Sequence, residues 1–153
     1  MNDMRRKTRM LLWQWGSTRE RIERLERERI SAKAWADDAL ETLKGMSYDG
    51  VGGSSGIKHD LSDVIAAAEK RSAQYADLVE RIDKEISDAI RLRNTIQEIV
   101  IDLTPLQERV LGYRYLDGHG WAYIAMKMQY DERWVRRIEG EAVDIIAEKI
   151  SIS

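Results

Sequence analysis

Three arginines lie within five residues near the carboxyl end of the chain, at positions 133, 136 and 137. A guanidinium group can donate two parallel hydrogen bonds to a phosphate or to the major-groove edge of guanine, so arginines grouped in this way suit nucleic-acid binding. A solvated helix face would explain the same arginines, and that alternative stays open. The candidate DNA-contacting residues of this segment are Lys127, Glu132, Arg133, Trp134, Arg136 and Arg137.

Catalytic chemistry has little support in the residue types present. The chain has no cysteine, and its two histidines, His59 and His119, are 60 positions apart, so neither a thiolate nor a histidine metal site is expected. The carboxylates of "RERIERLERER" lie beside arginines, as on the solvated face of a helix. The segment "GVGGSSG" lacks the lysine of a phosphate-binding loop. We therefore predict a protein that is not an enzyme, with no catalytic residue, no cofactor and no metal.

The composition indicates a helical protein. Of the 153 residues, 43% are hydrophobic and 34% are charged, and only one is proline. No apolar run approaches the roughly 20 residues that span a bilayer. We expect an all-α, cytoplasmic protein with no membrane partner.

Two long blocks show a heptad pattern, which is typical of coiled coils. Between them, residues 45–56 are rich in glycine and serine, which favours a loop. The sequence thus predicts an antiparallel coiled-coil hairpin over residues 1–103, with the loop at 45–56. The first seam runs through Leu11, Trp15, Thr18, Ile22, Leu25, Arg29, Ala32, Ala36, Ala39 and Leu43, and the second through Leu61, Val64, Ala68, Arg71, Tyr75, Leu78, Ile82, Glu85, Ala89, Leu92, Ile96, Ile99 and Leu103.

Two features of the predicted hairpin, a pair of like charges and an extra apolar row, would not be accommodated by packing against one partner helix. Folding about the loop is expected to bring Arg29 near the level of Arg71, and an apolar row flanks the second seam. A stripe this wide predicts a homodimer formed through the hairpin, whereas the C-terminal domain folding back over the stripe is the alternative. The flanking row consists of Ile65, Val79, Ile86 and Val100.

Residues 104–153 predict a three-helix domain. Thr104, Pro105 and Gln107 fit a capping box at a helix start, with Gly118 as a left-handed stop. A short helix follows from Trp121, and Asp131 is a suitable N-cap for the last helix. The spacing of a small residue, Ala125, and an aliphatic residue ten positions later, Val135, is that of a helix-turn-helix unit. The expected inward set also includes Ile124, Met128, Tyr130 and Ile138, with Trp121 buried against Val110.

The segment "WAYIAMKMQYDERWVRRIEGEAV" resembles the helix-turn-helix of region 4 of sigma-70 family factors. The chain as a whole resembles small phage-encoded, sigma region 4-like regulators in its hairpin, its "GM…GG" loop, "RVLGYRYLDG" and "WAYIA". The resemblance implies a DNA-binding transcriptional regulator of phage or prophage genes, of the late-operon activator type. It would bind double-stranded DNA at the nucleoid of the bacterial host, and a contact with host RNA polymerase is left open.

Several positions depart from the family. Gln129 stands where glycine is usual in the turn, and Gly120 where a serine or threonine cap is usual. Glu132, Arg133 and Trp134 differ from the family's usual residues, which puts its DNA sequence preference in doubt here. From Thr104 to Ser153, seven Lys or Arg face eight Asp or Glu, unlike most DNA-binding domains. A small terminase-like packaging or assembly protein, which would form a ring of many copies, is the alternative function.

Overall fold

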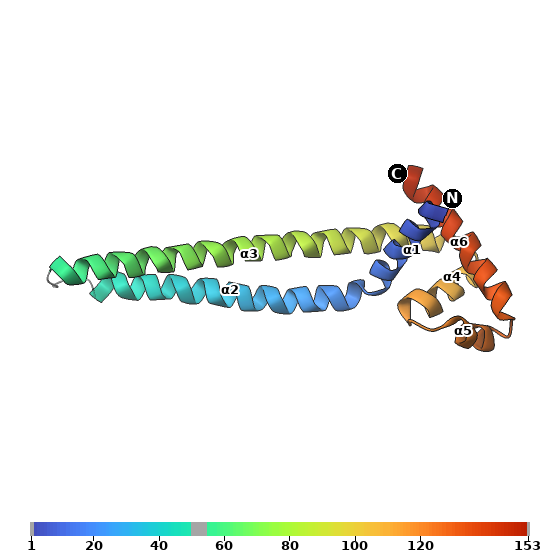
Figure 1. Cartoon of the computed structure of the whole chain (residues 1–153), viewed down its shortest axis with the longest axis horizontal. Helices are drawn as coiled ribbons and strands as arrows, with labels where there is room; N and C mark the ends of the chain where they lie inside the picture. Colours follow the sequence, from blue (N-terminus) through green and yellow to red (C-terminus); the bar gives the residue numbers. More distant parts are fainter. Residues whose placement is uncertain (1, 50–54, 153) are drawn as a thin grey trace. The chain divides into compact units, whose positions relative to one another are not determined.

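The computed structural model describes residues 2–49 and 55–152, and no strand occurs in these ranges (Figure 1). The expected all-α class is confirmed. Among the helices described, none is both long enough and apolar enough to cross a membrane. The helices are α1 (Asn2–Gly16), α2 (Thr18–Asp49), α3 (Ser55–Ile101), α4 (Pro105–Leu111), α5 (Trp121–Met128) and α6 (Glu132–Ile152), with a π-helical turn, η1 (Gly112–Leu116), directly after α4.

The chain divides into two compact units, and the division differs from the predicted boundary after residue 103. The first unit combines Met1–Ile22 with Asp88–Ser153, and the second is Glu23–Ser87. The predicted loop at 45–56 is also shorter than expected, because α2 continues through Gly45 to Asp49 and α3 begins at Ser55. Residues 50–54 of that loop lie outside the described residues.

In the second unit, α2 and α3 pack through an apolar cluster. Leu25, Ala32 and Ile82 are buried there, and Val79 and Ile86 pack against them. Arg29 forms an ion pair with Asp83, and the rings of Trp35 and Tyr75 have centroids 5.6 Å apart. Arg29 precedes Trp35 on α2, whereas its partner Asp83 follows Tyr75 on α3. The two helices are therefore antiparallel in this unit.

The pairing corrects the expected neighbour of Arg29. The sequence prediction placed Arg71 at the level of Arg29, but the carboxylate of Asp83 lies there and Arg71 is exposed. The predicted register was therefore wrong, since Arg29 lies level with Asp83 and not with Arg71. The two like charges therefore need no partner from outside the chain.

Most residues of the two predicted seams are buried or half-buried. Every seam member of α2 from Thr18 to Leu43 is buried or half-buried. On α3, Val64 and Arg71 are exposed, and Ile65 and Ser72 are half-buried in their place. A shift of one residue is expected where an α-helix of 3.6 residues per turn drifts from a strict 3.5-residue repeat.

The apolar row proposed as a dimer stripe is taken up within the chain. Val79 and Ile86 pack on the Leu25 cluster, and Ile65 is half-buried. Val100 is 7% exposed in the core of the first unit. This row is therefore not the wide free surface that the sequence predicted.

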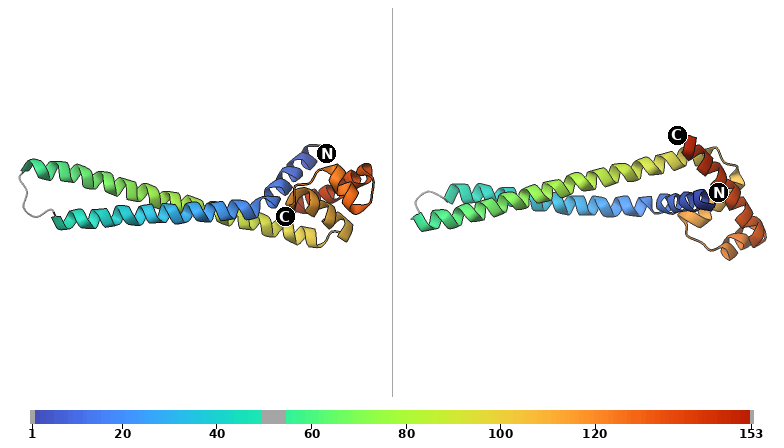
Figure 2. Two further views of the ribbon diagram at one scale, coloured as in Figure 1. Left: turned by 90° about the horizontal axis from the view of Figure 1, so that it is seen from below. Right: turned by 45° about the horizontal axis from the view of Figure 1, so that its top comes forward.

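The core of the first unit joins helices from both ends of the chain. Leu12 and Trp15 of α1 pack in one buried cluster with Ile96 of α3 and with Val143 and Ile146 of α6. In the views of Figures 1 and 2, α1 runs beside α6. The sequence prediction treated the residues before Gly16 as the start of one long helix, but α1 ends at Gly16 and α2 begins at Thr18.

A second cluster holds α4, α5 and α6 together. Thr104 forms the predicted capping box with Gln107, and Gly118 has the expected left-handed conformation, with φ 73°. Two expectations were wrong: Tyr130 is 45% exposed, because it lies in the turn beyond α5, and Trp121 is only half-buried at the edge of the cluster. The buried members are Val110, Ile124, Ala125, Met128, Val135 and Ile138.

Gly16 provides the first testable consequence of this packing. A Cβ atom at position 16 would lie 1.8 Å from the carbonyl oxygen of Tyr115, which is backbone and cannot move aside easily. We expect Gly16→Ala to lower the free energy of unfolding by about 1–3 kcal/mol, as overpacking does elsewhere, in urea titrations followed by circular dichroism.

Gly112→Ala is the matched control in the same unit. A Cβ at position 112 would meet no atom within 4 Å, and its φ of −61° is right-handed. This substitution should be neutral or stabilising by up to about 1 kcal/mol. Equal stability of the two variants would contradict the close approach of α1 to η1.

Candidate nucleic-acid interface

The turn between α5 and α6 is fixed by local hydrogen bonds. Gln129 has φ 59° and ψ 39°, so it adopts a left-handed conformation at the turn position where glycine is usual. The N–H of Tyr130 donates to the carbonyl of Ala125 at 3.1 Å, and the N–H of Trp134 donates to the Asp131 carboxylate at 2.7 Å. Asp131 therefore caps α6 as expected, and α6 starts at a defined angle to α5.

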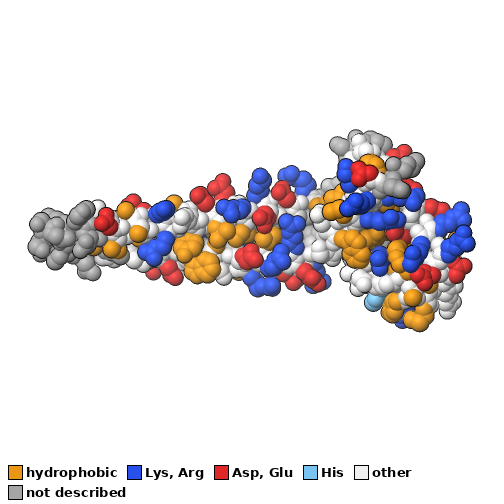
Figure 3. All heavy atoms as spheres, viewed as in Figure 1, with side chains coloured by type: hydrophobic (Ala, Val, Ile, Leu, Met, Phe, Trp, Pro, Cys, Tyr) orange, Lys and Arg blue, Asp and Glu red, His pale blue; other side chains and the backbone are white. Residues whose placement is uncertain are grey.

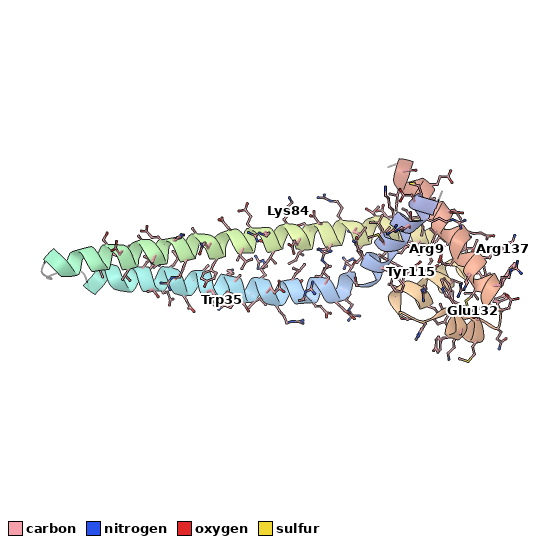
Figure 4. All side chains as sticks on the ribbon, in the orientation of Figure 1. Arg9, Trp35, Lys84, Tyr115, Glu132 and Arg137 are labelled. Atoms are coloured by element: carbon pink, nitrogen blue, oxygen red, sulfur yellow. The ribbon has the colours of Figure 1, made fainter. Side chains whose placement is uncertain are left out.

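The first turns of α6 have one buried side and one exposed side. Val135 and Ile138 point into the core, whereas Arg133 and Arg137 are exposed one helical turn apart. Figure 4 shows Arg137 on the outer side of α6. All five candidate residues on this helix are exposed, namely Glu132, Arg133, Trp134, Arg136 and Arg137.

Two of the three arginines are paired with carboxylates on the same helix. Arg136 contacts Glu132 at 2.9 Å, and Arg137 contacts Glu141 at 3.7 Å. Within the described ranges, Arg133 has no ion-pair partner. Exposed pairs of this kind contribute about 0–1 kcal/mol each, so a phosphate or a base edge can replace the carboxylate at little cost.

Lys127 lies apart from these arginines. It is exposed in the last turn of α5, with its ammonium group 5.8 Å from the centre of the Tyr123 ring. That ring in turn stacks on His119, with centroids 3.9 Å apart. Lys127 is thus placed on α5, whereas the three arginines are placed on α6.

The structure adds residues of α1 to this region, which the sequence analysis missed. Arg5 makes two hydrogen bonds to the Asp144 carboxylate, at 2.7 and 2.6 Å, and lowers the pKa of that carboxyl. Its guanidinium lies 3.6 Å from where a Cβ of Gly140 would be. The basic run "RRKTR" at positions 5–9 was the signal for these residues in the sequence. The sequence alone could not show that this run packs against α6.

Glu139 links three elements beneath the exposed face. Its side chain is buried, and it accepts hydrogen bonds from Arg9 of α1 at 3.1 and 2.9 Å and from the hydroxyl of Tyr115 in η1 at 3.4 Å. Figure 4 shows Arg9 and Tyr115 close together beside α6. The hydrogen bond from Arg9 to Glu139 raises the pKa of this arginine.

The inclusion of α1 changes the charge of the unit that holds the candidate site. The first unit carries fifteen Lys and Arg against thirteen Asp and Glu, whereas the second carries ten against fourteen. In Figure 3, blue Lys and Arg side chains gather over the region of α1 and α6. The acidic balance of residues 104–153 is thus reversed by the segment that packs on them.

Comparison with models of known families, with characterised proteins and with solved structures finds no match to this chain.

The buried hydroxyl of Tyr115 gives a prediction for alkaline pH. Burial, together with the nearby Glu139 carboxylate, raises the pKa of Tyr115 above its usual value. The stability that this neutral tyrosine contributes is therefore present below an unfolded pKa of about 10 and is lost as the pH rises through the folded pKa. We expect the phenolate absorbance to show one tyrosine that ionises later than the others.

Substitutions identify that tyrosine. Tyr115→Phe should remove the late phase of the titration, and Tyr130→Phe, at an exposed position, should leave it in place. A late phase that survives in Tyr115→Phe would mean that another tyrosine is the buried one.

Proposed function

We propose that this chain is a sequence-specific DNA-binding transcriptional regulator of phage or prophage genes that reads the major groove of double-stranded DNA with α6. In this proposal α5, the turn at Gln129 and α6 act as a helix-turn-helix. The observation that carries it is the exposure of Arg133 and Arg137, one turn apart on the side of α6 away from the core. An α-helix fits the major groove, and recognition helices present their first turns to base edges.

The chemistry of the first two turns fits base reading. A guanidinium can bind O6 and N7 of guanine together, and a carboxylate such as Glu132 can accept a hydrogen bond from cytosine N4. Arg136 lies farther round the helix, beside Trp121 of α5, where its guanidinium is 5.6 Å from the indole ring. We assign base contacts to Arg133 and Arg137 and a backbone phosphate contact to Arg136.

The sequence resemblance to sigma region 4-like regulators and the local geometry of the turn support the same function independently. Ala125 and Val135 are buried on α5 and α6, as the helix-turn-helix spacing predicts, and Gln129 adopts the left-handed conformation despite not being glycine. The slight excess of Lys and Arg in the first unit reduces the objection raised by the acidic C-terminal segment.

Substitution of the arginines tests this function. A DNA site would first be selected from random duplexes with the parent chain, and each variant would be titrated against it at several salt concentrations. Arg133→Ala and Arg137→Ala should each lose about 1–3 kcal/mol on the selected site and change its base preference. Arg136→Ala should weaken all duplexes similarly and reduce the salt slope by about one.

Arg109→Ala is the control, since Arg109 is an exposed arginine of α4 outside the α6 face. It should bind like the parent. If the parent enriches no sequence and the triple alanine variant of α6 binds duplex DNA equally well, the regulator proposal is wrong. A ring of many copies in solution would then favour the terminase-like alternative.

A homodimer formed through α2 and α3 remains part of the proposal. In the second unit, Trp35 is 50% exposed and borders a groove of about 350 Å³ that Leu78 and Ile82 also line. Ile30 is 68% exposed but faces away from that groove, because it lies about 140° further round α2 than Trp35. We therefore assign the dimer contact to the Trp35 groove in place of the row predicted from the sequence.

Assigning the dimer contact to the Trp35 groove predicts different results for two similar substitutions on α2. Trp35→Lys should reduce the molar mass measured by light scattering to that of one chain, 17.7 kDa, and Ile30→Lys should leave a dimer. A parent chain that is already monomeric, or a dimer that persists in Trp35→Lys, would contradict it.

A further inference from the structure

We infer that a cavity lined by residues of α1, η1, α5 and α6 binds a phosphate group of the DNA backbone, with Arg114 as its principal ligand. The inference rests on the proposed function, because it takes the phosphate from the same duplex that α6 reads. The cavity has a volume of about 290 Å³. Its walls include three guanidinium groups and two indole rings, from Arg9, Arg114, Arg136, Trp13 and Trp121.

Arg114 is the residue that points to a ligand. It is half-buried, and its guanidinium donates one hydrogen bond within the described residues, to the carbonyl of His119 at 3.1 Å. No carboxylate in the described parts of the chain pairs with it. A guanidinium has five N–H donors, and a half-buried cation without a counter-ion favours binding of an anion.

The two tryptophans hold the Arg114 side chain in place. Its guanidinium carbon lies 5.2 Å from the ring centre of Trp13 and 4.5 Å from that of Trp121. Such cation–π contacts restrict the planar group without using its N–H donors. The donors are thus left available in a fixed orientation, which reduces the entropy lost when a phosphate binds.

The remaining charges around the cavity leave it positive. Glu139 is its one carboxylate, and Arg9 and Tyr115 already donate hydrogen bonds to it. Arg136 is paired with Glu132 outside the cavity, and that exposed pair is readily exchanged. Three guanidiniums against one carboxylate give a net positive lining, which suits the single negative charge of a phosphodiester.

The start of α5 adds to the same potential. Gly120, its N-cap, has no side chain to accept a hydrogen bond from the first turn, and Trp121, the first helical residue, lines the cavity. The exposed N–H groups of a helix start carry partial positive charge and favour anions. This feature reinforces the site that Arg114 defines.

The geometry of α6 favours a DNA phosphate as the occupant. Arg136 contributes to the cavity from the same two turns of helix that present Arg133 and Arg137. A duplex whose base edges reach those two arginines carries a continuous row of phosphates along each side of the groove. As a consequence, Trp13 and Arg9 bring the N-terminal helix α1 into the DNA-binding surface.

Arg114→Gln tests the site, with Arg109→Gln as the matched control for loss of one charge in the same unit. Both duplexes, the selected site and an unrelated sequence, would be titrated over a range of salt concentrations. We expect Arg114→Gln to weaken both by about 10- to 100-fold at low salt and to reduce the salt slope by about one, with base preference unchanged. Arg114→Lys should recover part of the affinity, because it keeps the charge and loses the planar donors.

Circular dichroism and urea unfolding of each variant establish that the fold is intact before binding is compared. A folded Arg114→Gln that binds both duplexes as Arg109→Gln does would overturn the inference. If the parent enriches no sequence but Arg114→Gln still loses affinity for every duplex, the phosphate site stands and the regulator proposal fails. The two failures are therefore distinguishable.

A second measurement separates the sources of the phosphate. The indole N–H resonances of Trp13 and Trp121 report on the cavity in NMR spectra of the full chain. Duplex DNA should shift both in the parent and not in Arg114→Gln, and inorganic phosphate should shift them weakly. Shifts with inorganic phosphate alone would mean a site for free phosphate and would contradict the assignment to DNA.

Discussion

The buried carboxylate of Glu139 is the constraint on which the arrangement of the first unit depends. A charged group removed from water must be paired and hydrogen-bonded, and Glu139 obtains its partners from Arg9 and Tyr115, which lie 130 and 24 positions away in the chain. Satisfying this one group therefore requires α1 and η1 to lie against α6. The close passage of Gly16 over the backbone of Tyr115 follows from the same requirement, because a larger residue would hold α1 away.

Features that depend on neighbouring residues were predictable from the sequence. The capping box at Thr104, the Asp131 cap and the seam of α2 are decided within one or two helical turns, where residue type and spacing carry most of the information. The predictions that were wrong involve distant parts of the chain. Placing Arg71 opposite Arg29 required the loop length to within a few residues, and burying Tyr130 required knowledge of how the turn leaves α5.

The candidate site also has features that the local sequence predicts and features that depend on distant parts of the chain. That Arg133, Arg136 and Arg137 are exposed follows from the apolar periodicity of α6, which assigns Val135 and Ile138 to the core. The role of α1 did not follow, although a second signal was present in addition to the basic run at positions 5–9. Glu139 occupies a position between Val135 and Val143 on a helix face that is otherwise apolar, and a carboxylate in that place predicts a buried cationic partner. The partner itself could not be chosen from among the chain's arginines without the fold.

Under the proposed function, the positions of the arginines would separate two tasks that DNA recognition requires. Base contacts specify a sequence, whereas phosphate contacts set the register and orientation of the protein on the duplex. Arg133 and Arg137 lie on one rigid helix, which suits the first task, whereas Arg9, Arg114 and Arg136 come from three elements that meet at one cavity. Glu139 holds α1 against the other elements that line this cavity. Although the Glu139 side chain has no direct access to DNA, it would therefore still determine how α6 is presented to the major groove. Affinity for all sequences would then depend on the docking of α1, and discrimination between sequences would depend on α6 alone.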